Sequence, residues 1–203
     1  LLTGPFDNAG LASQAIIEAG RAMVASNLVD ACFGNISYRL GDTLLITTSG
    51  SFLDHLGDAV IAAPLDGSPC RTGNPSSELP THREIAASSR FRAVMHGHPP
   101  FSVIASMDCR VQGCASAGEC HRFCPHSREV GGVPVVSGQI GGGPFGLCTT
   151  VPEMLLKHQC AIVYGHGVFT CAAADFNEAL GRMAGIEDLC RSRYFRQVDA
   201  LIK

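Results

Sequence analysis

Hydrophobic and polar positions along the chain predict a helix near each end. Between Leu11 and Ser26, apolar residues recur three to four positions apart, which is the spacing of an amphipathic helix, and Asn27 suits its C-terminal end. Near the other end, Asp175 can cap a long helix in which apolar positions recur from Phe176 onward. These two helices frame the shorter elements between them.

The middle of the chain contains short apolar runs that predict strands. Residues 36–40 and 43–48 are two such runs, and Gly41-Asp42 between them is typical of a hairpin turn. Further strands are predicted at 59–63, at 93–98, and on both sides of Gly165-His166-Gly167. The segment from Cys109 to Gly146 is irregular, and its only predicted strand is 133–136. Short helices are predicted after Glu78, from near Pro100, and over 152–157. This order is not a regular alternation of strands and helices, so we expect an α/β fold with helices flanking a mostly antiparallel sheet.

Composition limits the class of protein. A chain of 203 residues with 46% hydrophobic content most simply forms one domain, residues 1–203, with a single large core. No apolar run approaches the roughly 20 residues of a membrane span, and the N-terminus lacks the pattern of a secretory signal. The net charge of −3 and the absence of a Lys/Arg run argue against nucleic acid as a partner. We expect a soluble, cytoplasmic protein that binds neither nucleic acid nor membranes.

Four of the ten cysteines lie within sixteen residues, at Cys109, Cys114, Cys120 and Cys124. Their spacing matches neither the usual zinc-ribbon pairs nor the common ferredoxin run. Four thiols on a glycine-containing loop can nevertheless close around an Fe–S cluster or a structural zinc. Two disulfides, which a reducing cytosol disfavours, and four free thiols are the alternatives. The sequence therefore predicts a Cys-rich insertion at about 109–126 as a candidate second metal or cluster site, structural in role.

Two histidines stand one residue apart at the end of a predicted strand. His96 and His98 project from the same face because side chains alternate along a strand, and Pro99 ends the strand. His166 lies between two glycines near another strand end, and Glu78 stands at a helix start. Taken singly, such a histidine is more often part of a turn, and such a glutamate suits the start of a helix. Together, three imidazoles and a carboxylate are typical of a zinc enzyme with an open coordination position.

Five motifs occur in an order that resembles the class II aldolase/adducin family. They are GNIS at 34–37, ITTSG at 46–50, SSE at 76–78 with His82 after it, HGHPP at 96–100 and YGHGV at 164–168. The resemblance covers roughly residues 10–108 and 144–195. It implies a three-layer α/β/α sandwich around a largely antiparallel sheet, and assembly as a homotetramer.

The resemblance also implies roles for individual residues. The metal ligands, for Zn²⁺ or another divalent ion, fall on His96, His98 and His166, and the catalytic acid/base falls on Glu78. The residues implied to bind the substrate phosphate are five residues of the motifs, namely Asn35, Ser49, Gly50, Ser76 and Ser77. His82 is expected to be structural and to bond to the backbone. A second acid, often a tyrosine in this family, stays unassigned among Tyr38, Tyr164 and Tyr194.

The implied function is that of a zinc-dependent aldolase, a lyase that cleaves a carbon–carbon bond in a small phosphorylated ketose. A sugar-phosphate 4-epimerase and a related dehydratase are the alternatives within enzymes. A non-catalytic adducin-like scaffold is the alternative that is not an enzyme. Such a scaffold would tolerate loss of the three histidines and the glutamate, but all four are present, which favours an enzyme. The segment from Cys109 to Gly143 departs from the family pattern, which leaves the identity of the sugar open.

Overall fold

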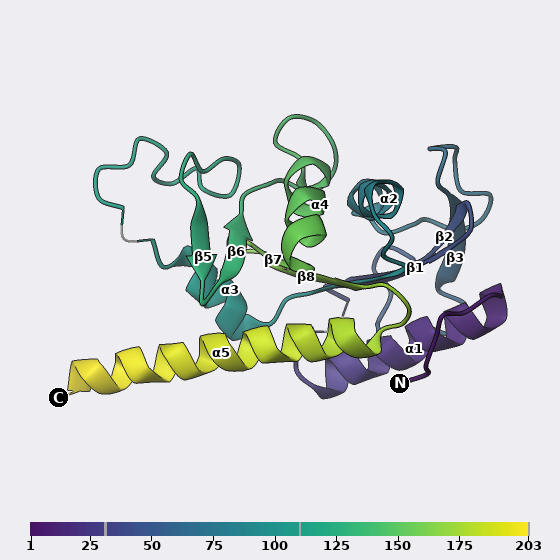
Figure 1. Ribbon diagram of the computed structural model, residues 1–203, viewed down its shortest axis with the longest axis horizontal. Helices are drawn as coiled ribbons and strands as arrows, with labels where there is room; N and C mark the ends of the chain where they lie inside the picture. Colours follow the sequence, from purple (N-terminus) through teal and green to yellow (C-terminus); the bar gives the residue numbers. More distant parts are fainter. Residues whose placement is uncertain (31, 110, 203) are drawn as a thin grey trace.

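The computed structural model describes residues 1–30, 32–109 and 111–202 and contains one eight-stranded sheet between two layers of helices (Figure 1). The strand order is β3-β2-β1-β4-β8-β7-β6-β5, and only the β6–β7 pair is parallel. The strands are β1 Asn35–Leu40, β2 Thr43–Thr47, β3 Val60–Pro64, β4 Ala93–Gly97, β5 Arg128–Val130, β6 Val133–Val136, β7 Cys160–Val163 and β8 Gly167–Ala172. The predicted mixed fold with a mostly antiparallel sheet is confirmed.

Three helices cover one face of the sheet and two cover the other (Figure 1). On one face lie α1 Ala9–Ala25, α3 Pro100–Met107 and α5 Asn177–Ile202, and on the other lie α2 Leu79–Ser88 and α4 Leu147–His158. The larger core joins α1 and α5 to the sheet, and a second core joins α2 and α4 to its opposite face. None of the helices in the described ranges is long and apolar enough to cross a membrane.

Local sequence explains where the first elements begin and end. Asn8 caps α1 because its side chain accepts a hydrogen bond from the backbone N–H of Leu11, and Asn27 takes the left-handed conformation just past the helix. The hairpin β1–β2 turns at Gly41, which also has a positive φ. Asp175 accepts a hydrogen bond from the backbone N–H of Asn177 at the start of α5, as a capping residue would.

The segment between α3 and β7 differs from the prediction in two places. A second strand, β5, pairs with β6 through a Gly131-Gly132 turn in which both residues have positive φ, a geometry that suits a tight hairpin. The helix predicted over 152–157 begins earlier, at Leu147, so Pro152 lies inside it. Leu147, Val151 and Leu155 form a fully buried stripe along α4. Burial of this stripe outweighs the hydrogen bond that the proline removes.

The Cys-rich insertion does not bring its thiols together as the predicted second metal site requires. A metal site needs three or more His, Cys, Asp or Glu side chains close together. In the described part of the chain, the one such group consists of His96, His98 and His166. Cys109, Cys114, Cys120 and Cys124 are free thiols, ranging from exposed to buried. Arg110, within the predicted insertion, lies outside the described residues.

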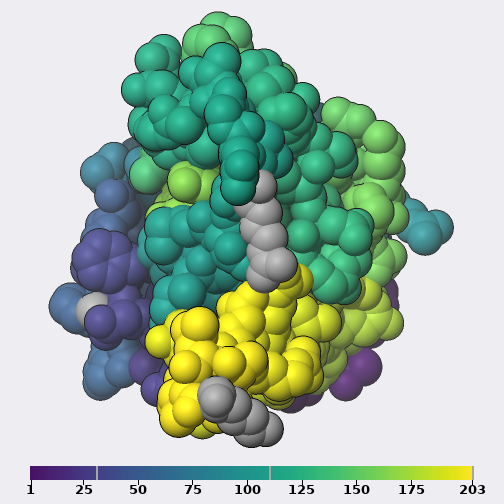
Figure 2. Space-filling model, turned by 90° about the vertical axis from the view of Figure 1, so that its left-hand side faces the viewer, coloured from purple at the N-terminus to yellow at the C-terminus, as the bar shows by residue number. Residues whose placement is uncertain are grey.

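Ordinary hydrogen bonds attach the insertion to the rest of the fold. The Ser137 hydroxyl donates to the Cys120 carbonyl at 2.6 Å, and the backbone N–H of Gly138 donates to the His121 carbonyl. Figure 2 shows the teal segment that follows α3 at the surface, above the yellow C-terminal part of α5. These bonds join the insertion to the loop after β6.

Candidate active site

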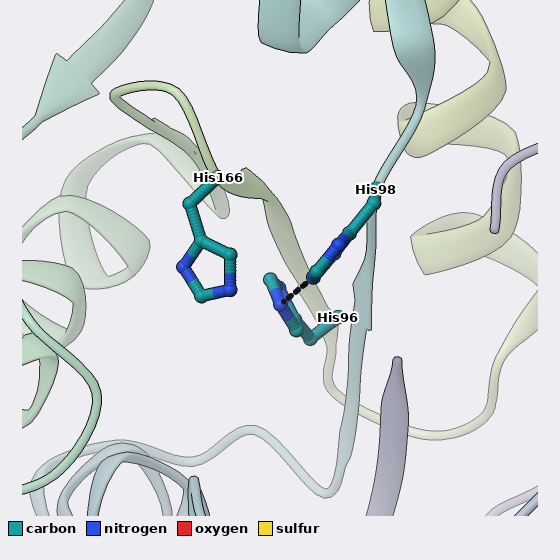
Figure 3. Close-up of side chains that lie close together, drawn as sticks. All are labelled: His96, His98 and His166. Carbon is teal, nitrogen blue, oxygen red and sulfur yellow. Dashed lines mark hydrogen bonds between the residues drawn. The ribbon is translucent and has the colours of Figure 1, made fainter. Parts of the chain in front are cut away.

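Three imidazole rings face one another at the end of the central strands (Figure 3). The ring centroids of His96, His98 and His166 lie 4.8, 4.9 and 4.7 Å apart, a nearly equilateral triangle. One ring nitrogen from each histidine lies within 4.8 Å of the other two. The structure therefore brings together the three predicted metal ligands, although they come from segments 70 residues apart in the sequence.

Strand pairing and two glycines bring the rings together. His96 is the fourth residue of β4, where it pairs with Phe169 of β8, whose ring stacks on the imidazole at a centroid distance of 4.2 Å. His166 stands in the turn between β7 and β8, where Gly165 has a positive φ. A Cβ on Gly167 would lie 2.4 Å from the Gly97 carbonyl oxygen and 2.8 Å from both the His96 and His98 rings.

Replacing Gly167 by alanine is expected to weaken divalent-metal binding by about tenfold or more, because the added methyl group displaces two of the three rings. Gly181→Ala, at an open position on α5, is the matched control and should bind metal as the wild type does. Isothermal titration with zinc measures both. Equal affinities in the two variants would mean that the rings move aside without cost.

The neutral charge of the three rings and the tautomer of His96 suit a metal. The Nδ1 atom of His96 lies 3.1 Å from the Val168 carbonyl oxygen, which can only accept, so Nδ1 carries the proton and Nε2 presents its lone pair to the centre. The Nε2 atom of His98 lies 2.9 Å from Nε2 of His96 and donates a hydrogen bond to it in the metal-free protein. Burial lowers the pKa of His98 to about 4 and also lowers the pKa of His96 and His166, which keeps the rings neutral. Three neutral imidazoles form a donor set that fits Zn²⁺.

Glu78 lies against the three histidines. Its Oε2 atom is 3.5 Å from Nε2 of His96, and its Oε1 atom is 3.6 Å from Nε2 of His166. Glu78 occupies the N-cap position of α2 but its side chain makes no capping hydrogen bond, so it is turned to the site rather than to the helix. The carboxyl group is buried, and this burial raises its pKa to about 7 against the opposing hydrogen bond from Asn35.

A chain of buried side chains stands behind Glu78. The amide nitrogen of Asn35 donates to Glu78 Oε2 at 3.0 Å, and the amide oxygen of Asn35 lies 2.5 Å from Nε2 of His82. The other ring nitrogen of His82, Nδ1, lies 2.6 Å from the Ser37 hydroxyl. The expectation that His82 bonds to the backbone is therefore wrong, because its ring joins two side chains of β1. Burial lowers its pKa to about 3, so the ring is neutral.

The residues predicted to bind phosphate line the same pocket, of about 140 Å³, as the histidines and Glu78. Ser49 and Gly50 follow β2, and Ser76 and Ser77 precede α2. Gly50 has a positive φ, and no side chain is near enough to contact a Cβ there. No Lys or Arg among the described residues lines the pocket. An anion here would be held by hydroxyl groups and backbone N–H groups.

None of the three tyrosines lines this pocket in the described part of the chain. Tyr38 is buried in the larger core, where its hydroxyl donates to the Ala174 carbonyl and accepts from the backbone N–H of Phe6. Tyr194 of α5 lies in an aromatic group with Phe195 of the same helix and Phe101 of α3. The chain by itself therefore places no tyrosine as a second acid.

Several residues that the sequence did not single out complete the surroundings of the site. Phe33 and Ile140 line the mouth of the pocket and are 57% and 56% exposed. The Ser106 hydroxyl of α3 accepts a hydrogen bond from the backbone N–H of Gly165, which fixes the turn that carries His166. Glu187 of α5 accepts hydrogen bonds from the backbone at the start of α3, directly after the segment that carries His98.

Comparison with known proteins identifies the pattern. The family model described as "Class II Aldolase and Adducin N-terminal domain" matches residues 14–194. Methylthioribulose-1-phosphate dehydratase of Gluconacetobacter diazotrophicus is 44% identical over 100 residues, covering 47% of this chain and 49% of that protein. 3,4-Dihydroxyphthalate decarboxylase of Arthrobacter keyseri is 26% identical over 200 residues, covering 91% and 78%.

The similarity to a solved structure covers more of this chain than the similarity to the dehydratase sequences does. L-fuculose-1-phosphate aldolase of Thermus thermophilus aligns with a TM-score of 0.73 and 25% identity, covering 94% of this chain and 96% of that one. The chain spans about half the length of the methylthioribulose-1-phosphate dehydratases that it matches. The similarity therefore reaches over most of the fold, while the reactions named for these proteins differ.

Proposed function

Because the chain belongs to the class II aldolase and adducin family, we propose that it is a divalent-metal-dependent lyase that cleaves a carbon–carbon bond in a small ketose 1-phosphate. The observation that carries this proposal is the meeting of three neutral imidazoles, a buried carboxylate and a group of hydroxyls in one pocket. The similarity to L-fuculose-1-phosphate aldolase of Thermus thermophilus supports the retro-aldol reaction.

We assign metal binding to His96, His98 and His166, with zinc as the ion that suits three imidazoles. When bound, the metal would act as a Lewis acid and stabilise negative charge on substrate oxygen atoms. The protein holds the ligands rigid, since His96 stacks on Phe169 and donates from Nδ1 to the Val168 carbonyl. Rigid ligands reduce the reorganisation that binding and reaction require.

We assign proton transfer to Glu78. Cleavage removes a proton from the hydroxyl group of the carbon that becomes the aldehyde, and returns a proton to the other carbon of the broken bond. Glu78 is the only acidic side chain that lines the pocket among the described residues, and it lies beside two of the three imidazoles. A carboxyl group so placed is within reach of a substrate held at the same centre.

We assign phosphate binding to the segments 49–50 and 76–77, with Asn35 at their inner edge. The serines at 76 and 77 stand just before Glu78, the N-cap of α2, so the N-terminal N–H groups and positive dipole end of this helix favour an anion there. Asn35 already donates one amide hydrogen to Glu78 and keeps a second for substrate. Binding a phosphate remote from the reacting carbons would hold those carbons beside Glu78.

A dehydratase is the second candidate, favoured by the 44% identity with methylthioribulose-1-phosphate dehydratase. Loss of water from a ketose also starts with removal of a proton beside a carbonyl group, which Glu78 can perform. Phe33 and Ile140 at the pocket mouth favour a substrate whose end remote from the phosphate is apolar, such as a deoxy or thioether group. This observation fits either reaction.

Product analysis separates the two candidates and tests the proposal. We expect a panel of ketose 1-phosphates to include one that releases an aldehyde, with kcat/KM at least about tenfold higher than for its unphosphorylated counterpart. Loss of water without an aldehyde would establish the dehydratase instead. Equal kcat/KM with and without the phosphate would contradict the assignment of the serine segments, and no turnover by the metal-loaded protein would contradict the lyase.

A further inference from the structure

We propose that His82 is a positioning residue, which holds the Asn35 side chain so that its amide N–H faces Glu78. The inference rests on the proposed function insofar as Glu78 is the acid/base. Its structural basis is the row of hydrogen bonds that runs from Ser37 through His82 and Asn35 to Glu78. His82 does not line the pocket, and its two ring nitrogens bond to Ser37 and Asn35, so its hydrogen-bond link to Glu78 runs through Asn35. Its ring also packs against Phe169, which stacks on His96.

When Glu78 is ionised, the chemistry of the groups fixes the direction of every hydrogen bond in this row. An ionised carboxylate only accepts, so the Asn35 atom that faces Glu78 is the amide nitrogen and the atom that faces His82 is the amide oxygen. An amide oxygen also only accepts, so Nε2 of His82 carries the proton. The ring is neutral, so its Nδ1 lacks a proton and accepts from the Ser37 hydroxyl. All three bonds therefore donate toward Glu78.

While Glu78 is ionised, burial makes this arrangement the only one that satisfies all four groups. Ser37 and His82 are fully buried, and Asn35 and Glu78 are nearly so, which leaves no water beside His82 to pair with a misplaced donor. Rotating the Asn35 amide by half a turn would set its oxygen against the carboxylate and its N–H₂ group against the His82 N–H. A buried acceptor that faces an acceptor, or a buried donor that faces a donor, costs the full desolvation free energy of both groups. Without the His82 donor, this rotation loses its main penalty.

The consequence is a Glu78 carboxylate with distinct oxygens. Oε2 accepts from Asn35 and lies toward His96, while Oε1 lies toward His166 with no hydrogen bond from the described residues. Neutral donors in series polarise one another, so the chain strengthens the bond to Oε2. Oε1 is then the oxygen left to exchange a proton with substrate. Losing His82 should reduce turnover more than substrate binding, because Asn35 is only one of the five residues that we assign to the phosphate.

Two substitutions of His82 separate positioning from packing. In His82→Gln, the side-chain nitrogen can take the place of Nε2 and donate to Asn35, whereas the shorter side chain of His82→Asn reaches only the position of Nδ1 beside Ser37. We expect kcat within about threefold of the wild type for His82→Gln and reduced about tenfold or more for His82→Asn. Zinc content should stay close to wild type in both variants, and KM should rise less than kcat falls in His82→Asn.

Equal losses of kcat in the two variants, in proportion to losses of thermal stability, would overturn the proposal and leave His82 a packing residue. An NMR spectrum that correlates the ring nitrogens of the zinc-loaded wild type with their neighbouring protons provides a second test without activity. A neutral His82 protonated on Nε2 is expected, and a proton on Nδ1 would overturn the proposal. If the wild type turns over no ketose phosphate, the lyase function fails, while this spectrum still decides the arrangement of His82.

Discussion

Replacing Glu78 by glutamine is expected to lower kcat by about 10²-fold or more and to leave the metal content unchanged. Glutamine keeps the shape of the side chain and its contact with Asn35, but it cannot take up a proton. The three histidines that we assign to the metal are unaltered, so the metal should stay bound. Steady-state kinetics with a substrate from the panel, together with metal analysis of the purified variant, measures both quantities.

Glu84→Gln is the matched control for this variant. Glu84 also lies on α2, further along the helix, but it is exposed and lines no part of the pocket. Its replacement should leave kcat and metal content at wild-type levels. A Glu78→Gln protein with near-normal turnover would mean that Glu78 is only an acidic residue at the start of a helix.

Replacing His98 by alanine is expected to weaken zinc binding by about 10²-fold or more and to abolish turnover at low metal concentration. Removing a partner outside the ligand shell already costs roughly 10- to 100-fold, so removing a ligand should cost at least as much. His98 is the best of the three positions to test because it lies past the end of β4 and is only partly buried, whereas His96 is 1% exposed. Its loss should therefore leave the fold intact.

His158→Ala is the control for the histidine variant, since His158 is an exposed residue at the end of α4, away from the pocket. Competition with a chromophoric chelator gives the zinc affinity of both proteins, and circular dichroism reports whether they are folded. Unchanged affinity in folded His98→Ala would remove His98 from the metal site.

The part of the fold that carries the motifs could be predicted because its signals are local. A Gly-Asp pair separates the two strands of the hairpin, and apolar periodicity marks both long helices. His96 and His98 were recognisable as a pair because side chains alternate in a strand. Their meeting with His166 was predictable only from the resemblance, since pairing of β4 with β8 joins residues far apart in the sequence.

Other features lay beyond local reasoning because they depend on tertiary contacts. His82 was expected to bond to the backbone, and nothing near it in the sequence indicates that β1 presents Ser37 and Asn35 to its two nitrogens. The start of α4 was misplaced because burial of a leucine and valine stripe overrides the usual position of proline. The four clustered cysteines suggest a metal by their number, yet the structure does not bring their thiols together.

The most direct test of the metal centre is X-ray absorption of the protein loaded with one equivalent of zinc. The predicted result is three histidine nitrogens about 2.0–2.1 Å from a single ion, with the histidine signal reduced in His98→Ala. Sulfur ligands in the wild-type spectrum would place the metal on cysteines instead. An ion without histidine ligands would contradict the proposal that His96, His98 and His166 form the catalytic metal site.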